Sequence, residues 1–127
     1  MRKLLFLALF GLFVCSSTTQ AQTVLDAAQT EDMLKTDPAV QLIDVRTPAE
    51  WQQTGVIEGA LRINFNSPDF QAQAAKLDKN KPIIVYCAAG GRSPRAAGML
   101  GKMGFRQVFD YAGGMTDWKA KGKKTVQ

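Results

Sequence analysis

Residues 82–93 read Pro-Ile-Ile-Val-Tyr-Cys-Ala-Ala-Gly-Gly-Arg-Ser, and this stretch decides the fold class. Its first five residues form a short apolar run rich in β-branched side chains, which is typical of a strand buried on both faces. Two alanines and two glycines follow, and from Ser93 to Met103 the apolar residues recur at helical spacing. A buried strand that leads through a tight loop into a helix is the building unit of an α/β fold.

The rest of the chain alternates in the same way. Strands are predicted at 40–45 and 107–111, and helices at 26–35, 48–54, 68–77 and 115–121. Residues 61–65 alternate and are expected to form an edge strand or an extended segment. Thr47, Pro48 and Glu50 have the pattern of an N-cap, a first-turn proline and a capping-box acid. The sequence therefore predicts one α/β domain, with a mostly parallel central sheet and helices on both faces. In such sheets the functional groups gather beyond the carboxyl ends of the strands, which is where Cys87 falls.

Residues 1–21 have the pattern of a secretory signal peptide. Arg2 and Lys3 precede an apolar run over 4–14, and a polar stretch then leads to Ala21. The run is shorter than the roughly 20 residues that span a bilayer. We expect cleavage after Ala21, which leaves a single domain over 22–127 in the periplasm or outside the cell. The chain would meet a membrane only during export. An uncleaved membrane anchor is the alternative.

Charge and composition exclude several classes of function. The formal net charge of +5 falls by two when Arg2 and Lys3 leave, and no basic run is interleaved with aromatic residues. We therefore expect no nucleic-acid partner. The lysines at 119, 121, 123 and 124 are predicted to form a solvated tail, or else a surface that attracts anions or lipid headgroups. The chain has no histidine, which excludes Cys–His and Ser–His catalysis and zinc sites with imidazole ligands.

Cys87 is the candidate nucleophile. Cys15 leaves with the signal peptide, so Cys87 is the one thiol of the mature chain. The loop that follows it consists of Ala88, Ala89, Gly90, Gly91, Arg92 and Ser93. Glycines let successive N–H groups turn inward, and the start of a helix behind them completes an anion cradle that favours a thiolate. Arg92 and Arg95 add positive charge. The alternative is a buried, inert cysteine after a core strand.

These residues carry a resemblance to a known family. The loop 87–93 resembles the C-x-x-G-x-R-S active-site loop of the rhodanese-like sulfurtransferases. Residues 42–51 resemble the family segment D-V-R-x-P-x-E-[FYW], and 55–64 resemble G-H-I-x-G-A-x-N-I. Residues 104–118 resemble the C-terminal pattern G-[FY]…V…L-x-G-G…W. Val56 departs from the family, because it stands where the family usually has histidine.

The resemblance implies a two-step sulfur relay. The Cys87 thiolate would take the outer sulfur of a small anionic donor such as thiosulfate and hold it as a persulfide. A thiophilic acceptor, either cyanide, a thiol or another protein, would then remove it. The N–H groups of 88–92 would stabilise both anions, and Arg92 and Arg95 would attract the donor. No metal or organic cofactor is implied. Asp44 and Arg46 are expected to be structural supports.

Loop length distinguishes this interpretation from a phosphatase or an arsenate reductase. Tyrosine-type phosphatases have a C-x5-R loop that encloses a tetrahedral phosphate, whereas four residues separate Cys87 from Arg92. A smaller ring suits a single sulfur atom. A carrier that passes its persulfide only to a docked protein stays open as an alternative to a free-standing enzyme.

Overall fold

The structure, a computed structural model, describes Gly11, Val14 and residues 22–127. The predicted signal peptide and its cleavage site therefore lie almost wholly outside the described residues. Within the part that is described, no helix is long and apolar enough to cross a membrane.

A five-stranded parallel sheet forms the centre of the molecule. Its strands are β1 (Thr23–Leu25), β2 (Gln41–Asp44), β4 (Leu61–Arg62), β5 (Ile83–Tyr86) and β6 (Val108–Tyr111). They lie in the order β1-β6-β5-β2-β4, and every neighbouring pair is parallel. All four residues of β5 are buried, as its apolar composition predicts. The predicted α/β fold with a mostly parallel sheet is thus confirmed.

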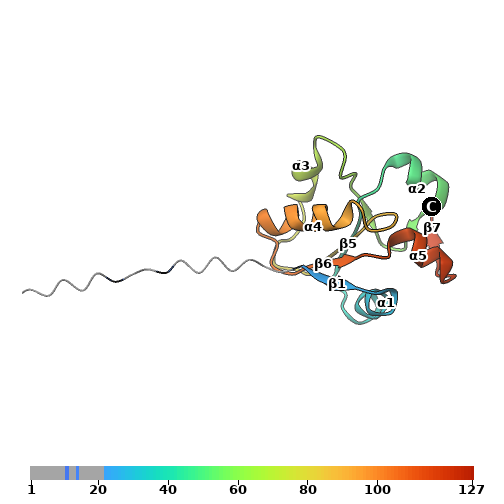
Figure 1. Cartoon of the computed structure of the whole chain (residues 1–127), viewed down its shortest axis with the longest axis horizontal. Helices are drawn as coiled ribbons and strands as arrows, with labels where there is room; N and C mark the ends of the chain where they lie inside the picture. Colours follow the sequence, from blue (N-terminus) through green and yellow to red (C-terminus); the bar gives the residue numbers. More distant parts are fainter. Residues whose placement is uncertain (1–10, 12–13, 15–21) are drawn as a thin grey trace, which may run out of the picture.

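Helices cover both faces of this sheet (Figure 1). They are α1 (Ala27–Thr36), α2 (Pro48–Thr54), α3 (Phe70–Ala74), α4 (Ser93–Lys102) and α5 (Gly114–Ala120). One buried cluster joins α3 and α4 to the sheet and contains Cys87, whereas a second joins α1 and α5 to the opposite face. The sheet is therefore sandwiched between two helical layers, with Cys87 on the α4 side.

Capping residues set where the helices begin. Asp26 caps α1, and its side chain and that of Gln29 each bond to the other's backbone N–H. Thr47 and Glu50 form the same reciprocal pair at the start of α2. Gly55 ends α2 with a φ of 70°, a conformation that a residue with a Cβ rarely adopts. The capping box predicted for α2 is confirmed.

The C-terminal segment is attached to the domain and is not a free tail, although Lys119, Lys121 and Lys124 are exposed to solvent as expected. A small antiparallel sheet pairs β3 (Val56–Ile57) with β7 (Thr125–Val126). Lys123 forms an ion pair with Glu31 and lies over the ring of Trp118. The paired strand and this ion pair hold the end of the chain against the body of the molecule. The side chains of Lys121 and Lys124 remain exposed.

Candidate active site

Cys87 lies directly after β5, buried under the loop that follows it. The N–H of Gly90 points at the cysteine Sγ, with a nitrogen–sulfur distance of 3.2 Å. The Ser93 hydroxyl lies 3.5 Å from the same sulfur. The Gly90 N–H and the Ser93 hydroxyl thus converge on one sulfur atom at the start of α4.

This convergence determines the ionisation of Cys87. Burial on its own raises the pKa of the Cys87 thiol, because it removes solvation of the thiolate. Hydrogen bonds from the Ser93 hydroxyl and from the N–H groups of Ser93, Arg92 and Gly90 act in the other direction. Together they outweigh burial, and the pKa of Cys87 is lowered below its ordinary value. The loop therefore favours a thiolate without help from a histidine.

The start of α5, at the glycine pair 113–114, is hydrogen-bonded to the backbone of the cysteine loop. The carbonyl oxygens of Cys87 and Ala88 accept hydrogen bonds from the N–H groups of Met115 and Thr116, both at 2.9 Å. Gly114 has a φ of 61°, and a Cβ there would lie 2.4 Å from the Cys87 carbonyl oxygen. Only glycine permits this close approach, so the start of α5 fixes the position of the loop.

Gly90 meets a similar constraint inside the loop. Its φ is 89°, and a Cβ on it would lie 2.7 Å from the carbonyl oxygen of Ala112. At Gly91 the φ is not positive, and a Cβ would meet no atom within 4 Å. Ala88 is half-buried, while Ala89 and Gly91 are exposed at the loop surface. Gly90, whose N–H contacts the sulfur, is therefore the position in this loop that requires glycine.

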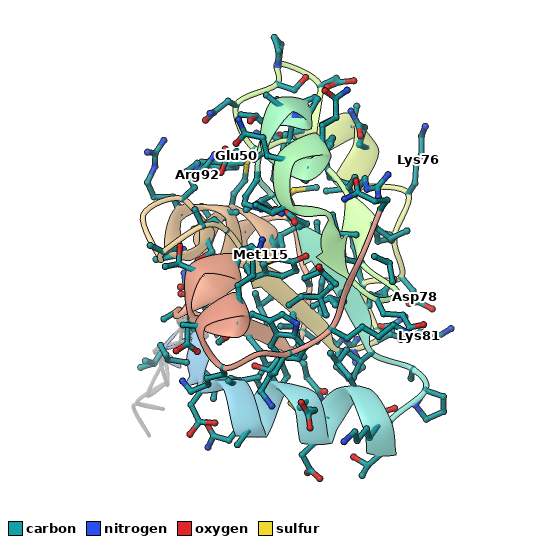
Figure 2. All side chains as sticks on the ribbon, turned by 90° about the vertical axis from the view of Figure 1, so that its right-hand side faces the viewer. Glu50, Lys76, Asp78, Lys81, Arg92 and Met115 are labelled. Carbon is teal, nitrogen blue, oxygen red and sulfur yellow. The ribbon has the colours of Figure 1, made fainter. Side chains whose placement is uncertain are left out.

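Arg92 forms an ion pair with Glu50. Its two terminal nitrogens donate to the two carboxylate oxygens of Glu50 at 2.6 and 2.9 Å. Figure 2 shows the two side chains meeting above the loop, one from α2 and the other from the segment before α4. The Arg92 guanidinium lowers the pKa of Glu50 to about 2. The pair fastens the cysteine loop to α2, and it partly neutralises the charge that we expected Arg92 to offer an anionic donor.

Arg95 lies apart from the sulfur. Its guanidinium carbon sits 5.2 Å from the centre of the Phe65 ring, and the side chain lines a groove beside α4 together with Met99 and Met103. Among the hydrogen bonds to Cys87 described above, none comes from Arg95.

Asp44 and Arg46 form a buried ion pair at the end of β2, with their closest nitrogen–oxygen distance at 2.8 Å. Arg46 also donates to Thr54 Oγ1 and to the carbonyl oxygen of Gly55, each at 2.8 Å. These bonds fix the last turn of α2, the helix that carries Glu50. Val56, at the family's histidine position, is buried in β3 and pairs with β7.

Across residues 22–127, no group of three or more histidine, cysteine, aspartate or glutamate side chains is arranged to hold a metal ion. Sequence reasoning missed two acidic residues near Cys87. Glu50 was assigned only its capping role, although it also holds Arg92. Asp110 was assigned no role, yet it is 2% exposed on the strand beside β5. An acid in an otherwise apolar strand was the available signal.

Known proteins are similar to this chain in sequence and in fold. Residues 26–121 match the family model described as the rhodanese-like domain. A sulfurtransferase of Allochromatium vinosum is 33% identical over 99 residues, which cover 78% of this chain and 83% of that protein. The thiosulfate sulfurtransferase PspE of Escherichia coli is 40% identical over 75 residues, covering 59% and 70%. The polysulfide-sulfur transferase homodimer of Wolinella succinogenes superposes with a TM-score of 0.72 at 27% identity, covering 83% and 78%.

The family match extends over most of the chain and includes the cysteine loop, the strands β2, β4, β5 and β6 of the parallel sheet, and the glycine pair behind the loop. The chain therefore belongs to the rhodanese-like domain family, and its relatives include sulfurtransferases.

Proposed function

We propose that this protein is a thiosulfate sulfurtransferase that carries sulfur as a persulfide on Cys87. The observation that carries the proposal is the set of donors around one buried sulfur. The Gly90 N–H and the Ser93 hydroxyl lie within hydrogen-bond distance of it, and polar groups of Ser93, Arg92 and Gly90 lower its pKa. Fixed donors of this kind stabilise an anion without reorganising during the reaction.

The first step loads the cysteine. The Cys87 thiolate attacks the outer sulfur of thiosulfate, a new S–S bond forms, and the S–S bond of thiosulfate breaks. Sulfite leaves with the bonding electron pair. We expect the resulting persulfide anion to extend from Cys87 into the loop and to accept hydrogen bonds from N–H groups of residues 88–92, of which that of Gly90 already contacts the sulfur. Neither oxidant nor reductant is consumed.

The second step removes the sulfur from Cys87. A thiophilic acceptor attacks the outer sulfur of the persulfide and the Cys87 thiolate departs, ready for another donor. Cyanide serves as the acceptor in an assay and yields thiocyanate, whereas a thiol or a protein thiol would serve in the cell. The similarity to relatives named sulfurtransferase and thiosulfate sulfurtransferase supports this chemistry.

The experiment is an assay of cyanide-dependent thiocyanate formation with purified protein. We expect turnover with thiosulfate in the wild type and none in Cys87→Ser, because a serine hydroxyl is nearly isosteric with a thiol but does not ionise. Activity that survives in Cys87→Ser would exclude the mechanism. A wild type that accepts sulfur but yields no thiocyanate would instead indicate a carrier that passes sulfur only to a docked protein.

We also propose that the protein acts outside the cytoplasm, in the periplasm or as a secreted protein. The support is the charged start, the short apolar run and the small residue at Ala21. Cleavage there would leave Gln22 as the first residue. Gln22 already contacts the domain, since its side-chain amide donates to the carbonyl oxygen of Pro94 at 3.1 Å.

A further inference from the structure

The ion pair between Glu50 and Arg92 occupies the arginine that would otherwise face an anion at the cysteine loop. The two terminal nitrogens of Arg92 each donate to a different oxygen of the Glu50 carboxylate. Paired hydrogen bonds of this kind between a guanidinium and a carboxylate are among the strong interactions of proteins. The negative charge of Glu50 therefore lies directly against the positive charge of Arg92, and the pair as a whole is neutral.

This pair lies beside the groups that surround the sulfur. Arg92 is next in the chain to Ser93, whose hydroxyl is 3.5 Å from the Cys87 sulfur, and two positions after Gly90, whose N–H contacts the same atom. Figure 2 shows the side chains of Glu50 and Arg92 together at this loop. The pKa of Arg92 is raised by Glu50 and, to a smaller extent, by the Cys87 thiolate. The charges of the pair and of the sulfur therefore interact.

Glu50 is also held from its own helix. The Thr47 hydroxyl donates to the carboxylate oxygen that Arg92 contacts, at 3.0 Å, and the Thr47 N–H lies 3.4 Å from that oxygen. Hydrogen bonds from Arg92 hold the pKa of Glu50 at about 2, so the carboxylate is ionised at neutral pH. A donor that took the place of Glu50 on Arg92 would have to separate the carboxylate from Thr47 as well. The negative charge therefore stays beside the loop when a donor approaches.

A fixed negative charge at this place selects among donors by their charge. The electrostatic energy between Glu50 and a donor is proportional to the charge of the donor, so a dianion is repelled twice as strongly as a monoanion at the same distance. We propose that Glu50 is a specificity-determining residue, which shifts the choice of sulfur donor from dianions such as thiosulfate toward singly charged anions such as thiosulfonates and persulfides. The inference rests on the proposed function, because it names the donor class of that reaction.

Two donors with the same chemistry isolate the effect of charge. Thiosulfate and the methanethiosulfonate anion both carry an outer sulfur on a sulfonyl sulfur, and they differ because a methyl group replaces one charged oxygen. With methanethiosulfonate, the Cys87 thiolate attacks the outer sulfur, the S–S bond of the donor breaks, and methanesulfinate leaves with the bonding electron pair. The same persulfide results. The value of kcat/KM for each donor reports this first step alone, so the ratio of the two values measures selection by charge.

A second pair of reagents tests the same effect without sulfur transfer. Iodoacetate and iodoacetamide both alkylate the Cys87 thiolate with loss of iodide, and they differ by one negative charge. The ratio of their rate constants cancels any change in the thiolate population.

The experiment compares Glu50→Gln with the wild type in both pairs of reagents. We expect the rate with the more negative reagent of each pair to rise about threefold to tenfold relative to its partner, because one repelling charge is removed. Both changes should shrink in about 1 M KCl, where charges are screened within about 3 Å. A purely structural role of Glu50 would change both members of a pair alike.

Glu31→Gln is the matched control. Glu31 forms an ion pair with Lys123, with side chains 34% and 23% exposed against 28% and 23% for Glu50 and Arg92. It lies on α1, which covers the opposite face of the sheet from Cys87. Both ratios in this variant should equal those of the wild type.

Arg92→Met should move both ratios in the opposite direction, because it leaves the charge of Glu50 without its partner, and it decides the question if Glu50→Gln does not fold. Ratios that stay at the wild-type value, or that change as much in Glu31→Gln, would overturn the proposal. A protein whose alkylation ratio shifts as expected, but which forms no thiocyanate from either donor, would exclude the proposed function and leave the selection by charge intact.

Discussion

At the scale of single residues, Glu50 connects two parts of the sequence that lie far apart along the chain. It closes the capping box of α2 with Thr47 and holds both terminal nitrogens of Arg92. The sequence pattern predicts the cap, because capping is local and depends on residues three apart. The pairing with Arg92 joins residues 42 positions apart. No local sequence pattern predicts that Glu50 pairs with Arg92, because the tertiary fold brings the two residues together.

We predict that Glu50→Gln destabilises the protein in a pH-dependent way. The Glu50 pKa is lowered from 4.5 to about 2 on folding, so the ion pair contributes its full stability above about pH 5.5. That contribution is lost as the pH falls through 4.5 toward 2. Since both side chains are about a quarter exposed, we expect a loss of about 1–2 kcal/mol at pH 7. Urea unfolding at pH 7 and pH 3 measures it, and the gap to the wild type should shrink by more than half at pH 3.

Glu58→Gln is the matched control. Glu58 pairs with Lys124 at 3.7 Å with both side chains largely exposed, and such pairs contribute little. We expect no measurable pH-dependent difference for this variant. A gap for Glu50→Gln that stayed constant between pH 7 and pH 3 would show that the ionised carboxylate is not what holds Arg92.

At the scale of elements, the cysteine loop depends on one glycine more than on its neighbour. Gly90→Ala would force a Cβ to 2.7 Å from the Ala112 carbonyl oxygen at a φ of 89°, whereas Gly91→Ala meets no atom within 4 Å. We predict that Gly90→Ala loses about 1–3 kcal/mol of stability and at least tenfold in sulfur transfer, about 1.4 kcal/mol of transition-state stabilisation. Gly91→Ala should keep both within experimental error.

Unfolding curves and thiocyanate rates for the two variants check this prediction. If both alanines were tolerated equally, the position of the Gly90 N–H would not be what stabilises the sulfur anion. If both were equally harmful, the loop would require flexibility rather than one left-handed residue.

Elements with strong periodicity were predictable, and short ones were not. The strand at 82–86 and the helix that begins at Ser93 are present within one residue of the predicted ends. β1, β3 and β7 were missed, because strands of two or three residues carry too few side chains to show an alternation. Residues 61–65, expected as an edge strand or an extended segment, form an edge strand only over Leu61–Arg62.

At the scale of the whole molecule, the sequence predicts where Cys87 lies but not what surrounds it. A reactive group after a buried strand follows from the rule for parallel sheets, and the inward N–H groups follow from the glycines. The contacts from Met115 and Thr116 and the pairing of Glu50 with Arg92 come from distant segments. Their positions depend on how the crossover helices pack, which no local pattern specifies.

Export concerns the whole chain as well. We predict that the mature protein recovered from the producing cells begins at or near Gln22, because the peptidase cuts after a small residue that follows the apolar run. Mass spectrometry of the intact protein measures this directly. Protein that retains Met1 in a soluble cytoplasmic fraction would contradict it.

The central claim is that Cys87 carries sulfur, and the mass of the intact protein tests it most directly. Wild-type protein incubated with thiosulfate and freed of excess reagent should gain the mass of one sulfur atom, and brief treatment with cyanide should remove it. Cys87→Ser should gain nothing under the same conditions. A wild type whose mass does not change, or a sulfur atom that also appears on Cys87→Ser, would contradict the account.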